Sequence, residues 1–164
     1  MKTLFLVRHA KSDWENSNLL DIERPLNERG YSNANSMSLL FKEKQDNPDL
    51  IITSPAIRAI TTALIFARNL NYDSNLISIQ KELYESSVKD YLKVVSKTDE
   101  QFKSIILFAH NPTISGFAET LCKSLPMEMP TCAIAGIHFD CKKWGDLKTT
   151  KGELFLFEYP KKQV

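Results

Sequence analysis

Side chains that could hold a phosphate follow three short apolar segments of this sequence. The four residues are Arg8, His9, Arg58 and His110. A guanidinium is a planar fork of N–H donors that matches the oxygens of a phosphate. Two guanidiniums together with two imidazoles would surround a tetrahedral oxyanion from several sides, so these residue types predict a phosphate site.

Phosphoryl transfer is the chemistry that such a site favours. Neighbouring arginines lower the pKa of an imidazole, which keeps one ring nitrogen free to attack phosphorus at neutral pH. A histidine is then a competent nucleophile. Because the transition state carries negative charge on the equatorial oxygens of the phosphoryl group, the same arginines would stabilise it without a metal or a cofactor.

The three apolar segments are predicted to be buried strands of a parallel sheet. They span residues 3–7, 49–53 and 104–109 and are rich in strand-forming residues. In an open α/β sheet, the carboxyl ends of the strands face the ligand crevice. We therefore expect the two arginines and the two histidines to converge at one edge of the sheet.

Helices are predicted to begin directly after the second and third of these strands. Ser54 and Asn111 are expected to be the N-caps, and Pro55 and Pro112 suit the first turns. Free backbone N–H groups and the positive ends of helix dipoles would then favour an anion in the crevice.

The rest of the chain completes an alternation of strands and helices. Further elements are predicted as a helix capped by Asn27 and reaching about residue 44, a strand at 76–80, a helix with its core face at 88–95, and two terminal strands at 132–140 and 153–159. This order predicts an α/β fold with helices on both faces of a mostly parallel sheet and an antiparallel pair at one edge.

Length and composition limit the classes of protein. The chain has 164 residues, of which 43% are hydrophobic, so we expect one domain over 1–164. A net charge of +1 gives no basic surface for nucleic acid or a membrane. Three cysteines without metal spacing indicate a reducing compartment, and no segment has the pattern of a signal peptide or membrane span, so a cytoplasmic protein is expected.

Three motifs resemble those of the histidine phosphatase superfamily, whose members include phosphoglycerate mutases and small phosphohistidine phosphatases. "LVRHAKS" is similar to its Arg-His-Gly signature, "SPAIRAITTA" to its second arginine segment and "FAHNPTIS" to its second histidine segment, in the family order. With "RPLNERG" and "LYESS", the similarity covers most of the chain. Its compactness resembles the SixA-like phosphohistidine phosphatases. The resemblance implies a three-layer α/β/α sandwich.

The resemblance also implies a role for each matching residue. His9 would be the nucleophile that becomes a phosphohistidine. Three further residues would bind and neutralise the phosphoryl group: Arg8, Arg58 and His110. Arg24 of "RPL" matches a position that reaches the same pocket, although a salt bridge where the first helix begins is the competing interpretation.

The resemblance also implies an acid that protonates the leaving group, but it does not single out one residue for this role. In "ELYESS" the best match is Glu85, with Glu82 second, and either side chain could instead lie in solvent. Two positions depart from the family pattern. Ala10 replaces the usual glycine, so the turn after His9 should avoid positive φ, and Thr61 replaces a frequent glutamine.

Three other polar residues have open interpretations. Ser12 could donate to phosphate or serve a turn, and Asn111 is better explained as a cap residue. His138 lies within a predicted strand, and a zinc site formed with His9 and His110 is an alternative to a structural histidine.

The sequence therefore predicts a metal-independent phosphatase that acts through a phosphohistidine intermediate. The resemblance favours phosphohistidine on a protein as the substrate. A phosphatase or mutase acting on a small phosphate ester is the first alternative. A phosphate-binding module that has lost catalysis is the second.

Overall fold

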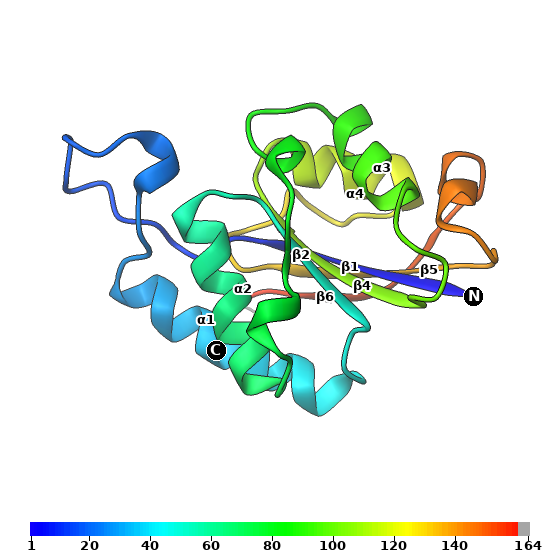
Figure 1. Cartoon of the computed structure of the whole chain (residues 1–164), viewed down its shortest axis with the longest axis horizontal. Helices are drawn as coiled ribbons and strands as arrows, with labels where there is room; N and C mark the ends of the chain where they lie inside the picture. Colours follow the sequence, from blue (N-terminus) through cyan, green and yellow to red (C-terminus); the bar gives the residue numbers. More distant parts are fainter. Residues whose placement is uncertain (161–164) are drawn as a thin grey trace.

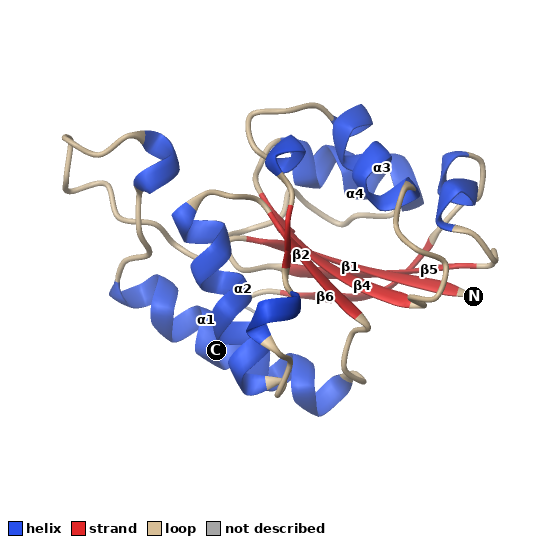
Figure 2. Ribbon diagram, in the orientation of Figure 1, coloured by secondary structure: helices blue, strands red, loops and turns tan. Residues whose placement is uncertain are grey.

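The computed structural model describes residues 1–160 and has a mixed β-sheet at its centre (Figures 1 and 2). The last four residues of the predicted domain 1–164 lie outside the described residues. The strands of the sheet are β1 (Lys2–Arg8), β2 (Leu50–Thr53), β3 (Ser78–Ile79), β4 (Ser104–Ala109), β5 (Ile134–Phe139) and β6 (Glu153–Glu158). Their spatial order is β3-β2-β4-β1-β5-β6, so β1 has a partner on each side.

The sheet is mostly parallel, as predicted. β1 and β2 both pair with β4 in parallel, and β3 continues this arrangement beside β2. β5 pairs antiparallel with both β1 and β6, so the predicted antiparallel pair at one edge is confirmed. Arg8 lies opposite Ala109 in the β1–β4 register, and His9 and His110 therefore leave the sheet at the same edge.

Helices cover both faces of the sheet, which confirms the three-layer α/β/α arrangement. They are α1 (Glu28–Lys44), α2 (Ile57–Asn69), α3 (Val88–Ser96) and α4 (Thr113–Cys122). The pair α1 and α2 packs on one face and the pair α3 and α4 on the other (Figure 1). Leu4 and Leu6 of β1 lie in the core beneath α3 and α4, whereas Phe5 and Val7 lie in the core beneath α1 and α2. Burial on both faces explains why the run 3–7 is continuously apolar.

The predicted start of α1 is confirmed. Asn27 is its N-cap, and its Oδ1 accepts a hydrogen bond of 2.8 Å from the backbone N–H of Gly30. The buried residues Ala34, Met37 and Phe41 then recur at helical spacing along the face that meets the sheet.

The predicted start of α2 is wrong. The helix begins at Ile57 with Ala56 as its N-cap, and no side chain among residues 1–160 caps it. Ser54 and Pro55 lie before the helix. The Ser54 hydroxyl contacts the ring of His110, 56 residues away in the chain, and accepts a hydrogen bond of 3.2 Å from the backbone N–H of Ala56, the residue before the helix.

The predicted start of α4 is also shifted. Pro112 is the N-cap rather than a first-turn residue, and Asn111 precedes it. The Asn111 side chain accepts a hydrogen bond of 2.6 Å from the Ser115 hydroxyl and donates one of 2.9 Å to the Met129 carbonyl. It ties the helix to the loop before β5, which explains why it does not cap the helix.

The strand predicted at 76–80 is shorter in the structure, where β3 covers Ser78–Ile79. A 3₁₀ helix, Ser74–Leu76, occupies the start of the predicted range, and the Asp73 side chain accepts a hydrogen bond from the Asn75 backbone there. Within residues 1–160 no helix is both long enough and apolar enough to cross a bilayer. The three cysteines of this part of the chain form no disulfide.

Candidate active site

The two arginines and two histidines predicted to form the site all line one cavity at the carboxyl edge of the sheet. The cavity has a volume of about 260 Å³. Its lining residues are Arg8, His9, Lys11, Ser12, Trp14, Arg24, Arg58, His110, Asn111 and Thr131. The ring centroids of His9 and His110 are 5.2 Å apart. The positions of β1, β2 and β4 in the sheet thus bring together three separate stretches of the sequence, which supply Arg8 and His9, Arg58, and His110.

His9 is held with one ring nitrogen occupied and the other available. Its Nδ1 lies 2.7 Å from the carbonyl oxygen of Ala10, and because a carbonyl can only accept, this nitrogen carries the proton. Nε2 therefore keeps its lone pair. Burial and the charges of Arg58 and Arg8 together lower the pKa of His9 to about 4 despite this hydrogen bond. The ring is neutral at pH 7, as a nucleophile requires.

The turn after His9 has the conformation that the sequence predicted. Ala10 does not belong to the non-glycine residues with positive φ, so an alanine fits this turn without strain. Its backbone N–H donates to Thr62 Oγ1 at 3.1 Å, which attaches the turn to α2.

His110 is oriented by contacts on two sides. Its Nε2 lies 2.6 Å from the Ser54 hydroxyl, and its backbone N–H donates to the buried Tyr91 hydroxyl at 3.3 Å. Its Nδ1 is buried and has no hydrogen-bond partner among residues 1–160. Burial and the neighbouring positive charge of Arg58 lower the pKa of His110 to about 3, so this ring is also neutral at pH 7.

Both arginines of the predicted cradle have an unsatisfied N–H. Arg8 Nη1 donates to the Met129 carbonyl at 3.0 Å, while Arg58 Nη1 and Nη2 donate to Asp21. The Nε atoms of both arginines are buried without a hydrogen-bond partner in the described part of the chain. An unpaired buried donor is costly. Both arginines nonetheless line the cavity, so their guanidiniums give it positive charge that suits an oxyanion.

Arg24 lines the cavity and also makes the salt bridge of the competing interpretation. Its Nε lies 3.1 Å from Asp21 Oδ1, and its Nη1 donates to the buried Ser12 hydroxyl at 2.8 Å. Its guanidinium carbon lies 3.4 Å from the ring centroid of Trp14. Arg24 therefore both lines the phosphate cavity and forms a salt bridge, as the two interpretations of the sequence predicted. Ser12 lines the same cavity.

Asp21 is a component of the site that the sequence did not reveal. Its carboxylate accepts hydrogen bonds from Arg24, from Arg58 at 2.9 Å and from the Tyr84 hydroxyl at 2.6 Å. Burial disfavours its charge, but the hydrogen bonds from Tyr84 and Arg58 outweigh burial and lower the pKa of Asp21 to about 2. The spacing to Arg24 was a local signal of pairing. Nothing in the sequence indicates the partnership with Arg58, 37 residues away.

The two candidate acids do not line the cavity. Glu85 and Glu82 are exposed to solvent, and Glu85 has a left-handed backbone with φ of 49°. None of the cavity-lining residues, all within residues 1–160, is an aspartate or glutamate.

His138 lies far from the other two histidines. It pairs with Thr3 near the start of β1, whereas His9 follows the end of that strand. Its Nδ1 lies 3.1 Å from the Thr3 hydroxyl, and its ring stacks on Phe155 at 3.7 Å between centroids. The zinc site with three histidines is therefore contradicted by the geometry. No other group of possible metal ligands occurs in the described range 1–160.

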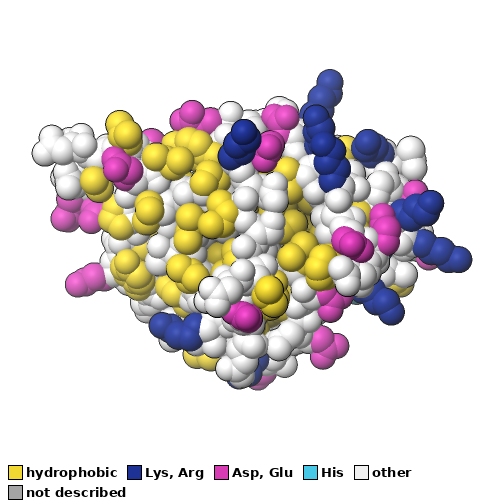
Figure 3. All heavy atoms as spheres, viewed as in Figure 1, with side chains coloured by type: hydrophobic (Ala, Val, Ile, Leu, Met, Phe, Trp, Pro, Cys, Tyr) yellow, Lys and Arg dark blue, Asp and Glu magenta, His cyan; other side chains and the backbone are white. Residues whose placement is uncertain are grey.

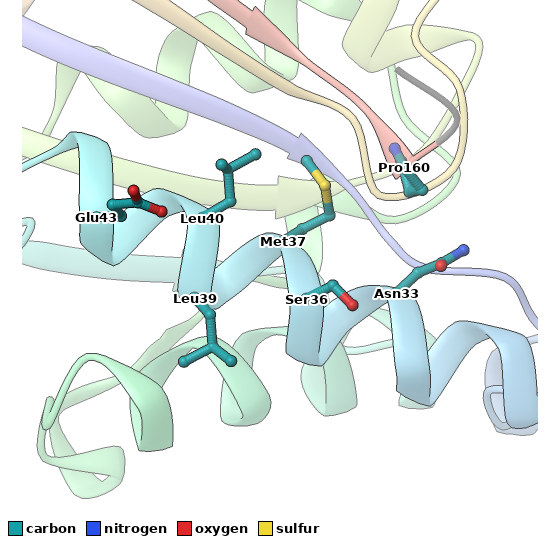
Figure 4. Close-up of a pocket in the computed structure, with 7 residues that line it drawn as sticks. All are labelled: Asn33, Ser36, Met37, Leu39, Leu40, Glu43 and Pro160. Carbon is teal, nitrogen blue, oxygen red and sulfur yellow. The ribbon is translucent and has the colours of Figure 1, made fainter. Parts of the chain in front are cut away.

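Three arginines and Lys11 give the cavity its positive charge. In the face shown in Figure 3, most of the Lys and Arg side chains lie at the end opposite to the loop that follows β1. A larger hollow of about 350 Å³ lies between α1 and Pro160 (Figure 4). Its only charged lining residue within the described chain is Glu43, so it is unsuited to an anion.

Comparison with known proteins places these features in a family. Residues 4–104 match the model of the histidine phosphatase superfamily (branch 1). Phosphoglycerate mutase 1 of Saccharomyces cerevisiae is 40% identical over 67 residues, which make up 40% of this chain and 27% of the mutase. The match thus spans about a quarter of the length of that curated relative.

Solved structures share the fold over nearly the whole chain. A SixA protein from Agrobacterium tumefaciens has a TM-score of 0.83 and 27% identity, covering 97% of this chain and 98% of its own. A protein histidine phosphatase SixA complexed with tungstate has the same fold, with a TM-score of 0.84 and 22% identity over 99% of both chains. Since the family match also includes two of the three motifs that the sheet brings together, this chain belongs to the histidine phosphatase superfamily.

Proposed function

We propose that this protein is a metal-independent phosphatase that removes the phosphoryl group from phosphohistidine on a protein, through a phosphohistidine formed on His9. The observation that carries the proposal is a cavity lined by arginines and two neutral histidines but by no carboxylate within residues 1–160. An alkoxide leaving group needs a proton from an acid, which contributes roughly a hundredfold or more to the rate. An imidazole leaving group does not need that acid.

In the first step, His9 Nε2 gives its lone pair to phosphorus while the bond from phosphorus to the substrate nitrogen breaks. The electron pair of the broken bond stays on that nitrogen. Because the other nitrogen of the substrate ring carries a proton, the leaving group is a neutral imidazole. Arg8, Arg58 and His110 hold the phosphoryl oxygens by hydrogen bonds, and the two arginines neutralise the negative charge of these oxygens in the transition state.

In the second step, a water oxygen bonds to phosphorus and the bond to His9 Nε2 breaks. The electron pair returns to Nε2, the proton of the water passes to solvent, and inorganic phosphate is released. The carbonyl of Ala10 holds the proton on Nδ1, 2.7 Å away, during both steps. His9 therefore also departs as a neutral imidazole, so one hydrogen bond supports attack and release alike.

The surface around the cavity supports a macromolecular substrate. A second hollow, of about 820 Å³, shares Lys11, Ser12 and Trp14 with the phosphate cavity and continues to Leu26 and Tyr31. The chain on either side of a phosphorylated residue has room there. The likeness to a structure described as a protein histidine phosphatase agrees with this proposal.

Hydrolysis of a small phosphate ester is the second candidate. The 40% identity to a phosphoglycerate mutase over 67 residues favours it. Glu85 would then have to reach the cavity as the acid. Turnover of a phosphohistidine peptide and of sugar phosphates by wild type and Glu85→Gln separates the two: ester hydrolysis should fall with the variant, and phosphohistidine hydrolysis should not.

Trapping the phosphohistidine intermediate tests whether the protein is an enzyme or only a module that binds phosphate. Wild type mixed with a phosphodonor should carry an acid-labile phosphoryl group, His9→Ala should carry none, and His138→Gln is the matched histidine control outside the cavity. A wild-type protein that acquires no phosphoryl group would contradict the catalytic proposal. Activity that survives excess EDTA is expected, and its loss would contradict the metal-independent mechanism.

A further inference from the structure

An exposed aromatic ring stands at the rim of the phosphate cavity. Of the residues that line this cavity, Lys11 and Trp14 are the exposed ones, and Trp14 is 73% exposed. His9 is 7% exposed and forms the buried side. An in-line displacement places the leaving group opposite the attacking nitrogen. The leaving group must therefore lie toward the open rim, where this indole is.

The indole is held in place although it is exposed. The guanidinium of Arg24 lies against one face of the ring, 3.4 Å from its centroid. Arg24 is 8% exposed and is itself fixed by Ser12 at 2.8 Å and by Asp21 at 3.1 Å. The exposure of Trp14 therefore comes from its opposite face and its edges. A ring that is already oriented loses little conformational freedom when a partner stacks on it.

We infer that Trp14 forms a leaving-group subsite, in which the imidazole ring of the substrate phosphohistidine packs against the free indole surface. This inference rests on the proposed function and narrows it, because it selects a planar ring over a flexible alkyl chain. Trp14 is then a specificity-determining residue. Aromatic rings prefer offset-stacked or edge-to-face contacts with one another, and an aliphatic lysine side chain gains less from the same surface.

The neighbouring hollow fits this placement. Trp14 lies between the phosphate cavity and the hollow of about 820 Å³ and lines both of them. A substrate ring on the indole would thus have its phosphoryl group in the cavity and its backbone directed toward the hollow. The subsite joins the part of the protein that does the chemistry to the surface that can hold a polypeptide.

Matched peptides test the subsite. Two peptides of one sequence carry phosphohistidine or phospholysine at the same position, and kcat/KM is measured for both with wild type, Trp14→Ala and Trp14→Phe. We expect Trp14→Ala to lower kcat/KM for phosphohistidine roughly fivefold more than for phospholysine, and Trp14→Phe to keep most of the preference. Leu20→Ala, a truncation of another exposed apolar side chain in the same loop, should leave the ratio of the two substrates unchanged.

The other outcomes overturn the inference in distinguishable ways. Equal losses on both peptides would mean that Trp14 acts by holding Arg24, and no loss on either would mean that the ring is unused. If wild type itself fails to hydrolyse the phosphohistidine peptide, the proposed function fails, and the subsite inference fails with it. That result is seen before any variant is compared.

Discussion

Arg58 is held by Asp21 through two hydrogen bonds, one to the backbone carbonyl at 2.7 Å and one to the carboxylate at 2.9 Å. The same carboxylate also accepts from Arg24 at 3.1 Å. One acidic residue in the loop after β1 therefore fixes the direction of two guanidiniums that border the phosphate cavity. Asp21 lies outside that cavity, so its role is to position the arginines.

Replacing Asp21 by Asn should weaken phosphate binding by the site. The amide removes the charge that pairs with both arginines. Because the carboxylate is half-exposed, solvent reduces the value of this pairing to about 1 kcal/mol, or a roughly fivefold rise in KM with a smaller change in kcat. Steady-state kinetics on the best substrate would show this. Glu23→Gln in the same 3₁₀ helix is the control, and equal effects from both variants would contradict the positioning role.

Ser54 should set the orientation of the second histidine. Its hydroxyl lies 2.6 Å from His110 Nε2, which leaves Nδ1 directed away from this contact and unpaired within the described residues. Ser54→Ala should lower kcat about tenfold through the lost hydrogen bond, and Ser54→Thr should restore most of it. Nitrogen chemical shifts of the His110 ring would report the tautomer. An unchanged ring spectrum in Ser54→Ala would rule out this role.

Activity should persist into mildly acidic solution. His9 attacks in its neutral form, and its pKa lies near 4 because of burial and the charges of Arg58 and Arg8. kcat/KM should stay nearly level from pH 7 to pH 5 and fall as the pH approaches 4. A fall centred near pH 6.5 would show that the ring titrates like a solvated histidine and would contradict the buried geometry.

The free energy of unfolding should decrease as the pH is lowered from 7 toward 4. His9 has an unfolded pKa of 6.5 and a folded pKa of about 4, so the unfolded chain binds more protons between these values. The stabilisation that the neutral His9 contributes is therefore fully present above pH 6.5 and is lost as the pH falls toward 4. Between pH 7 and pH 5 this histidine should remove about 2 kcal/mol from the free energy of unfolding.

Denaturant titrations of wild type and His9→Asn at the two pH values would measure this contribution. The variant lacks the titrating group, so its loss of stability between pH 7 and pH 5 should be smaller by about 2 kcal/mol. Parallel losses in the two proteins would contradict the link between burial of His9 and stability.

Much of the fold was predictable because its signals are local. The run 104–109 matches β4 residue for residue, and Asn27 caps α1 as its position suggests. Arg8, His9, Arg58 and His110 were predictable as a group, since parallel strands bring residues at their carboxyl ends to one edge. Each of these inferences needs only the residue type and its place relative to an apolar run.

The remaining features depend on contacts between distant parts of the chain. Ser54 has the residue type of a cap, but its hydroxyl contacts His110 and the backbone N–H of Ala56, which precedes the helix. Asp21 resembles a surface acid until the fold brings Arg58 beside it. Glu85 follows a family motif and nonetheless lies on the exposed surface. Side-chain partners and directions of this kind are decided by packing, which no local pattern contains.

The central position of β1 has a consequence for motion. Thr3–Arg8 pairs with β4 on one side and Lys2–Val7 with β5 on the other, so the strand that carries the nucleophile cannot separate without breaking the middle of the sheet. Its amides should exchange with solvent deuterium only through global unfolding. The loop with Trp14 and Asp21 belongs to no such ladder beyond the single bridge between Ser12 and Leu26. The strand that places the nucleophile should therefore open much more slowly than the loop that borders the entrance for the substrate.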